Sequence, residues 1–240
     1  MAPIGPPSIV NVLLEARAGG ELAMLLPQWP MLRLMAPKGA GRVIVLPGFL
    51  ADDRWTWLLR QFLRDLGYQV EPWSLGVNRG PLMDYVTAIS SRLEQDAAAG
   101  VENASLVGWS RGGLIAREVA RDVPHLVRSV VTLGSPVRGG HTGTRIGPWV
   151  VSTSGVSSRF ISNWFDERSQ RPIQVPVTSI YSRSDGVVSW KACRDESTPG
   201  LRHQEIESSH IGLVANAGVY RAVAEALGTV HRATQGATRE

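Results

Sequence analysis

The residues best suited to chemistry lie in segment 108–112, Gly-Trp-Ser-Arg-Gly, which has the pattern Gly-x-Ser-x-Gly. An apolar run, residues 104–107, precedes the segment, and an amphipathic run, residues 114–120, follows it. This arrangement is typical of a sharp turn between a buried strand and a helix, where a serine is exposed as a nucleophile. The flanking glycines let the strand and the helix approach closely, because they have no Cβ. We therefore predict that Ser110 is a catalytic nucleophile.

An acid and a base follow Ser110 along the chain. Residues 177–181 are β-branched and read as a strand, and Asp185 lies in the Gly-marked turn that follows. Residues 204–207 are predicted to form a short last strand, with His210 just beyond it. The C-terminal ends of parallel strands meet at one edge of a sheet, where ligands bind. We therefore predict that Asp185 orients His210 and that His210 is the general base.

The chain contains rivals to these residues. Asp185 precedes a glycine, and an Asp in that position often only shapes a turn. Asp195 is the competing acid. His203 is the competing base, but it precedes the predicted strand and is expected at the opposite edge of the sheet. The other histidines lie before Asp185 or near the C-terminus: His125, His141 and His231.

The same turn predicts a site for negative charge. The first amides of a helix lack partners within the helix and carry the positive end of its dipole. The backbone NH of Arg111 is therefore predicted to bind the oxyanion that forms when a serine attacks a carbonyl group.

The remaining segments alternate between strand and helix, which predicts a mostly parallel sheet with helices on both faces. Ser8 is expected to cap a helix over residues 9–17, and the glycines and prolines of residues 19–37 predict an irregular lead-in. Asp52 or Asp53 is expected to cap the next helix, which Gly67 ends. Further strands are predicted at residues 43–46, 68–73 and 129–133, and further helices at 81–96 and 215–227.

Taken together, these motifs resemble the α/β-hydrolases of the lipase and esterase group. The resemblance covers most of the chain, and it is carried by residues 42–49, 108–113, 132–136, 182–188 and 208–213. It implies one α/β-hydrolase domain over residues 1–240 and a serine hydrolase that needs no metal or cofactor. It also implies that the backbone NH of Phe49 is a second oxyanion donor. This chain has Pro47-Gly48 where many lipases have His-Gly, and proline has no amide hydrogen.

The alternation lapses at residues 138–172, which we expect to form a short cap over the site. Its apolar groups suit an acyl chain, although they could instead simply pack onto the sheet. The candidate pocket residues are Leu50, Trp109, Trp149, Phe160 and Trp164. Trp109 and Trp190 also fit a packing role, and residues 231–240 read as a flexible tail.

The composition of the chain limits the classes of partner that the protein is expected to bind. The formal net charge is +4 and basic residues are scattered, which argues against a nucleic-acid partner and permits only transient contact with a lipid surface. Cys193 is the only cysteine, so an internal disulfide or a thiolate metal cluster is excluded. The sequence has neither a signal-like start nor an apolar run that could span a membrane, so a cytoplasmic location is expected, with secretion of a processed form left open.

These observations predict an esterase or lipase that cleaves carboxylic esters through an acyl-enzyme on Ser110. The substrate would be a small-molecule or lipid ester. Two other functions fit the same residues: an acyltransferase that uses the same three side chains, and a non-catalytic binding module on this fold.

Overall fold

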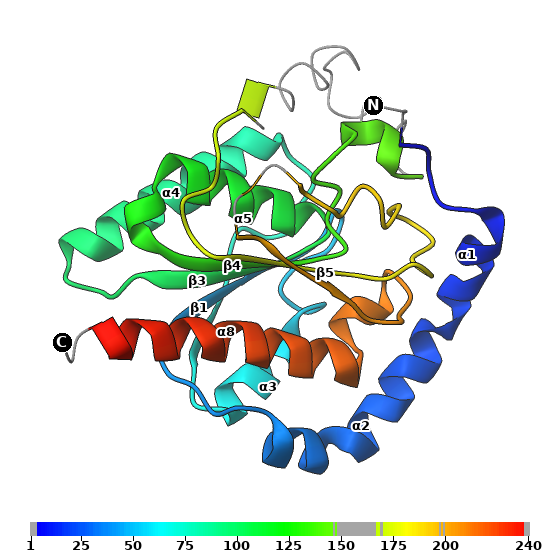
Figure 1. The fold of residues 1–240 in the computed structure, drawn as a ribbon, viewed down its shortest axis with the longest axis horizontal. Helices are drawn as coiled ribbons and strands as arrows, with labels where there is room; N and C mark the ends of the chain where they lie inside the picture. The colour runs from blue at the N-terminus through cyan, green and yellow to red at the C-terminus, as the bar shows by residue number, and fades with distance from the viewer. Residues whose placement is uncertain are drawn as a thin grey trace.

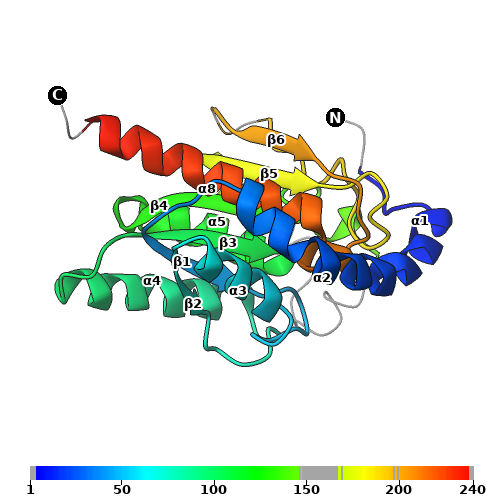
Figure 2. The same cartoon turned by 90° about the horizontal axis from the view of Figure 1, so that it is seen from below.

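One parallel sheet organises the chain in the computed structural model, which describes residues 4–145, 147, 167–168, 170–196, 198 and 200–237. The sheet of the described residues has six strands in the order β2-β1-β3-β4-β5-β6, and every neighbouring pair is parallel (Figures 1 and 2). The strands are β1 (Arg42–Leu46), β2 (Gln69–Pro72), β3 (Ala104–Trp109), β4 (Val127–Leu133), β5 (Val177–Tyr181) and β6 (Arg202–Glu205).

Helices cover both faces of this sheet. Helices α4 and α5 lie on one face, and α3 and α8 lie on the other, with α2 beside α8 (Figures 1 and 2). The main helices are α1 (Ile9–Leu14), α2 (Ala18–Met35), α3 (Trp57–Asp65), α4 (Leu82–Ala98), α5 (Arg111–Asp122) and α8 (Ala217–Ala237). Short 3₁₀ helices lie at η1 (Glu15–Arg17), η2 (Pro124–Leu126), η3 (Gly140–Gly143) and η4 (Gly212–Val214).

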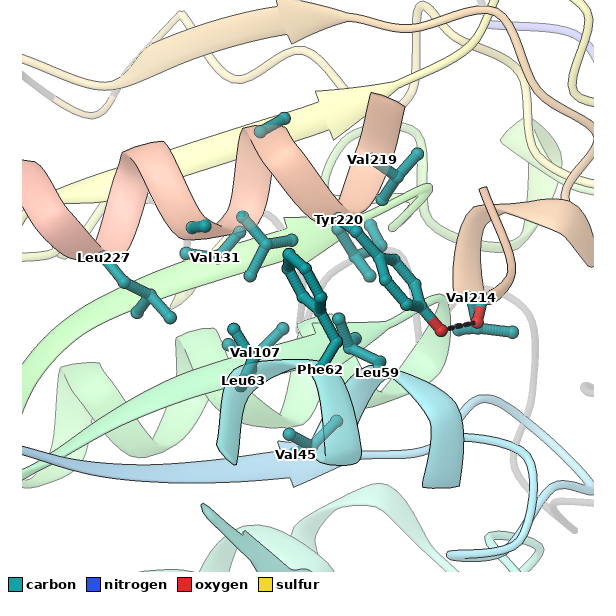
Figure 3. Packing of buried hydrophobic residues seen from close by; sticks show 14 of the residues in the cluster. Val45, Leu59, Phe62, Leu63, Val107, Val131, Val214, Val219, Tyr220 and Leu227 are labelled. Carbon is teal, nitrogen blue, oxygen red and sulfur yellow. Dashed lines mark hydrogen bonds between the residues drawn. The ribbon is translucent and has the colours of Figure 1, made fainter. Parts of the chain in front are cut away.

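Alternating residues of the central strands build a core on each face. In β1, Val43 and Val45 pack with α3 and α8, while Ile44 and Leu46 pack with α4 and α5. Figure 3 shows the α3 and α8 side, where the Tyr220 hydroxyl donates a hydrogen bond to the carbonyl oxygen of Val214 at 2.7 Å. Burying each such apolar side chain contributes about 2 kcal/mol. The predicted α/β sheet with helices on both faces is confirmed.

The N-terminal lead-in differs from the prediction. The Ser8 side chain caps α1 as expected, accepting a hydrogen bond from the backbone NH of Asn11 at 3.2 Å. The irregular segment predicted after it is instead helix α2, which contains Pro27 and Pro30. Tertiary packing outweighs the two prolines, because Leu25 is fully buried and Trp29 packs against the core.

Three smaller predictions are also corrected. Strand β6 begins at Arg202, so His203 lies inside the strand rather than before it. Helix α8 is longer than the predicted helix over residues 215–227, since it continues to Ala237. Neither Asp52 nor Asp53 caps α3, because the N-cap position is Thr56; the carboxylate of Asp53 instead accepts the backbone NH groups of Trp73 and Ser74. None of the described helices is long and apolar enough to cross a membrane.

Candidate active site

Ser110 occupies the turn between β3 and α5, in a backbone conformation that residues other than glycine rarely adopt. Its φ is 53° and its ψ is −119°. Such a conformation costs about 1–3 kcal/mol in a residue other than glycine and persists only where the surroundings enforce it. Its backbone NH donates to the carbonyl oxygen of Leu133 at 2.7 Å, at the C-terminal end of β4. Ser110 therefore sits at the edge of the sheet that the sequence predicted.

The glycines around the turn allow this geometry. A Cβ on Gly108 would lie 2.4 Å from the backbone of Gly112, and a Cβ on Gly112 would lie 2.4 Å from the carbonyl oxygen of Leu46. Since these neighbours are backbone atoms, they cannot rotate away. The strand, the helix and the end of β1 thus meet at a distance that only glycine permits.

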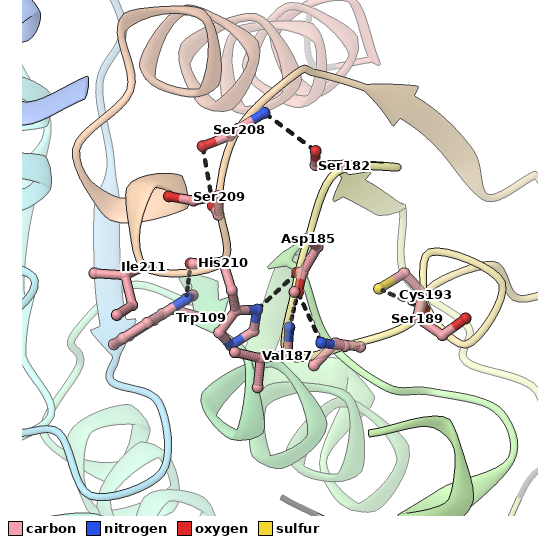
Figure 4. Close-up of polar contacts among 12 residues, drawn as sticks. Trp109, Ser182, Asp185, Val187, Ser189, Cys193, Ser208, Ser209, His210 and Ile211 are labelled. Atoms are coloured by element: carbon pink, nitrogen blue, oxygen red, sulfur yellow. Dashed lines mark hydrogen bonds and ion pairs between the residues drawn. The ribbon is translucent and has the colours of Figure 1, made fainter. Parts of the chain in front are cut away.

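The predicted acid and base are in direct contact. The carboxylate of Asp185 accepts a hydrogen bond from Nδ1 of His210 at 2.7 Å, and both side chains are buried (Figure 4). The other oxygen of Asp185 accepts the backbone NH groups of Val187 and Val188 at 2.8 and 2.7 Å. The carboxylate is therefore fixed, and the contact directs Nε2 of the imidazole away from it.

The pKa of His210 is raised above its ordinary value. Burial lowers the pKa, but the negative charge of Asp185, its hydrogen bond and the charge of Glu15 together outweigh burial. The imidazole is thus a stronger base than a free histidine.

Several contacts bring this acid–base pair to Ser110. A Cβ on Gly134, the residue after Leu133, would lie 3.1 Å from the carboxylate of Asp185 and 3.2 Å from Nδ1 of His210. The indole of Trp109 donates to the carbonyl oxygen of His210 at 3.0 Å, and the two rings lie 5.7 Å apart. Trp109, at the end of β3, and Gly134, just after β4, therefore both lie close to the pair.

The described residues include no hydrogen bond between the Ser110 hydroxyl and the His210 ring. This contact is often long in enzymes without substrate and tightens when substrate binds. Ser110 is 5% exposed and His210 is 4% exposed, so both side chains lie just beneath the surface.

The loop after β1, residues 47–51, lies beside the start of α5. The buried side chain of Asn78 holds it by donating to the carbonyl oxygen of Pro47 at 2.8 Å, and the NH of Leu50 donates to the carbonyl oxygen of Asn78 at 2.9 Å. The guanidinium of Arg111 lies 5.4 Å from the ring centre of Phe49. The two predicted oxyanion residues are therefore neighbours.

Arg111 also has a role that the sequence analysis missed. Its guanidinium donates to the carbonyl oxygen of Gly80 and lies over the ring of Tyr85 as well as that of Phe49. Burial lowers the pKa of this arginine. The side chain fastens the loop before α4 to the turn that carries Ser110.

The candidate pocket residues have separate outcomes. Leu50 is 47% exposed and stands next to Phe49, whereas Trp109 is buried and stacks on Trp55 at 6.0 Å. Trp109 therefore has the packing role that the sequence analysis also considered. The other three candidates lie outside the described residues, as does most of the predicted cap at residues 138–172: Trp149, Phe160 and Trp164.

The rival residues lie together in a different cluster. The carboxylate of Asp195 pairs with the buried guanidinium of Arg117, and the backbone NH of Asp195 donates to Nε2 of His203 at 3.2 Å. Among the described residues, no group of three or more His, Cys, Asp or Glu side chains could hold a metal ion.

Sequence comparison gives a short match. No protein-family model matches the chain. A segment of 43 residues, 18% of this chain, is 51% identical to proteins named triacylglycerol lipase from Pseudarthrobacter phenanthrenivorans and Burkholderia plantarii. The match spans only 14% and 12% of the lengths of those relatives.

Structural comparison extends over most of the chain. A monoacylglycerol lipase of Paleococcus ferrophilus has a TM-score of 0.60 at 16% identity, over 81% of this chain and 96% of that one. Lipase B of Aspergillus fumigatus has a TM-score of 0.59 at 17% identity, over 79% and 52%. A lipase-esterase related protein of Clostridium acetobutylicum has a TM-score of 0.55 at 16% identity, over 79% and 94%. The chain thus has the α/β-hydrolase fold of these lipases and esterases.

Proposed function

We propose that this protein is a carboxylic ester hydrolase that works through an acyl-enzyme on Ser110. The observation that carries the proposal is the buried hydrogen bond between Asp185 and His210 at 2.7 Å, beside a serine held in a strained turn. This combination serves to activate a hydroxyl group as a nucleophile. The lipases and esterases that share the fold support the choice of an ester as substrate.

Each residue has one task in the proposed reaction. The hydroxyl of Ser110 attacks the ester carbonyl while Nε2 of His210 removes its proton, and Asp185 stabilises the imidazolium that forms. The backbone NH groups of Arg111 and Phe49 bind the oxyanion. His210 then gives the proton to the departing alcohol, and a water molecule releases the acid from Ser110 by the same steps.

The first test is the variant Ser110→Ala, with hydrolysis of p-nitrophenyl esters as the measurement. We expect kcat to fall on the order of 10⁶-fold, because the nucleophile of a serine hydrolase is lost. A fluorophosphonate probe should label the wild-type protein at Ser110 and leave the variant unlabelled. Ester turnover that survives in the variant, with a circular dichroism spectrum like that of the wild type, would contradict the proposal.

A second measurement separates hydrolysis from acyl transfer. Both reactions begin with the same acyl-enzyme, so the partition of the acyl group between water and an added alcohol distinguishes them. We expect free acid to be the main product even with the alcohol present. Predominant formation of a new ester would identify an acyltransferase, and absence of both labelling and turnover would identify a binding module.

A further inference from the structure

The N-terminal helices hold the two loops that carry Asp185 and His210. We call residues 182–188 the acid loop and residues 206–212 the base loop. Helix α1 and the start of α2 lie along both loops in Figures 1 and 2. The contacts that join them span most of the sequence, since Glu15 bonds to partners 171 and 195 residues further along the chain.

Glu15 is the centre of this contact. One oxygen of its carboxylate accepts the backbone NH of Gly186 and the backbone NH of His210, both at 2.8 Å. The other oxygen accepts the NH of Ile211 at 3.2 Å. One side chain therefore binds the residue after the acid and the base itself, so that it fixes the separation of the two loops.

The docking of α1 on the acid loop is close. A Cβ on Gly186 would lie 2.4 Å from the carbonyl oxygen of Asn11 and 2.8 Å from Cα of Val12. The side-chain amide of Asn11 donates to the carbonyl oxygens of Arg183 and Asp185 at 2.8 and 3.3 Å. The helix is thus in backbone contact with the loop that aims the carboxylate of Asp185.

Glu21 makes the matching contact on the base loop. Its carboxylate accepts the backbone NH of Ser209 at 2.8 Å and the hydroxyl of Ser208 at 2.5 Å. A Cβ on Gly212 would lie 1.8 Å from the same carboxylate. Arg17 neutralises Glu21 through an ion pair of 3.1 Å, whereas Glu15 has no cationic partner among the described residues.

From these contacts we infer that Glu15 is a positioning residue for the acid–base pair, holding Asp185 and His210 in register through their backbones. The backbone of His210 is fixed on both sides, because Glu15 binds its NH and Trp109 binds its carbonyl oxygen. The ring is then fixed by Asp185. Loss of the Glu15 contacts removes the restraint on the NH of His210, while Glu21 still holds Ser208 and Ser209 of the base loop.

The charge of Glu15 also affects the pKa of His210, a quantity that a purely structural contact would leave unchanged. The charged groups that act on the His210 ring are Asp185 from the acid loop and Glu15 from η1, and both raise the pKa of His210 against the lowering effect of burial. Strand β3 contributes the uncharged Trp109 to the same ring. Removing the charge of Glu15 should therefore lower the pKa of His210.

The test compares Glu15→Gln, Glu15→Ala and the control Glu207→Gln. Glu207 lies on the base loop, its side chain is 81% exposed, and it pairs only with Arg17 among the described residues. We expect Glu15→Gln to move the acid limb of kcat/KM to lower pH. We expect Glu15→Ala to lower kcat about 10- to 100-fold with a smaller change in KM, because catalytic groups lose their alignment. Glu207→Gln should change neither quantity.

The kinetic readout rests on the proposed ester hydrolysis, so a second measurement stands apart from it. The imidazole of His210 is titrated by NMR in the wild-type protein and in Glu15→Gln, with its signal assigned from a His210→Gln variant. A lower midpoint in Glu15→Gln supports the inference even if no ester is turned over, in which case only the proposed function fails. An unchanged midpoint in Glu15→Gln overturns the inference, and this test remains valid if Glu15→Ala does not fold. If Glu15→Ala does fold, an unchanged kcat in that variant also overturns the inference.

Discussion

At the scale of single residues, His210 is held at three points. Its ring, its NH and its carbonyl oxygen each have a partner, in Asp185, Glu15 and Trp109. Such restraint suits a base that must keep one tautomer and one orientation through two proton transfers. The acid that provides the ring contact is therefore the sharpest target for mutation.

We predict that Asp185→Asn lowers kcat about 10⁴-fold with the fold intact, because the amide favours the wrong tautomer of His210. The comparison variant is Asp195→Asn, which changes the rival acid. Asp195 faces the buried Arg117, so its replacement should cost on the order of 3 kcal/mol of stability and leave kcat nearly unchanged. Urea unfolding measures the stability of both variants, and ester hydrolysis measures their kcat. If Asp195→Asn loses more kcat than Asp185→Asn, the residue that orients His210 is Asp195 and not Asp185.

At the scale of elements, the turn at Ser110 depends on the close approach of α5 to the end of β1. We predict that Gly112→Ala destabilises the protein by about 1–3 kcal/mol, since the new Cβ would lie 2.4 Å from the carbonyl oxygen of Leu46 and 2.6 Å from that of Pro47. Activity should fall as well, because residues 47–51 and the Ser110 turn are then pushed apart. The measurements are the urea midpoint and kcat.

Gly20→Ala is the matched control for this variant. Gly20 lies within α2, and a Cβ there meets nothing within 4 Å. Alanine favours a helix over glycine by about 1 kcal/mol, so the control should be as stable as the wild type or more stable. Equal urea midpoints for Gly112→Ala and the wild type would show that α5 can shift without cost.

The elements that sequence could predict are those with a strong local pattern. Strand β5 has the predicted bounds, and α3 ends at Asp65, just before the glycine that the sequence marked, because burial and turn chemistry act within a few residues. Helix α2 was missed because its prolines argue against a helix locally, while its stability comes from packing on α8 and α3. Local pattern is a poor guide where tertiary packing decides.

The candidate site divides in the same way. Ser110, Asp185 and His210 could be predicted because each lies in the turn or loop that follows the C-terminal end of a strand, in a chain order set by the fold. Glu15 and Asn78 could not, since nothing in their neighbouring sequence marks them. Their partners lie far away along the chain, 195 residues for Glu15 and His210 and 31 residues for Asn78 and Pro47.

At the scale of the whole molecule, the sheet brings loops that are distant in sequence to the C-terminal ends of its strands. The N-terminal helices pack against two of these loops, the acid loop and the base loop. Beneath the acid loop lies a small separate core of Tyr181, Val188, Ala192 and Cys193. The NH of Val188 binds the carboxylate of Asp185, so this core and the candidate site share one loop. An opening of the loop would therefore expose the core and disturb the site together.

Cys193 is the only cysteine of the chain and reports on this opening. Its thiol is fully buried, and burial, together with the charge of Asp185, raises its pKa well above the ordinary value. We predict that a disulfide reagent such as DTNB labels the native protein far more slowly than a free thiol, because both access and thiolate formation require the loop to open. Labelling at low urea should accelerate in step with the loss of ester hydrolysis. A thiol that reacts at the rate of a free cysteine while full activity persists would show that this core opens independently of the site.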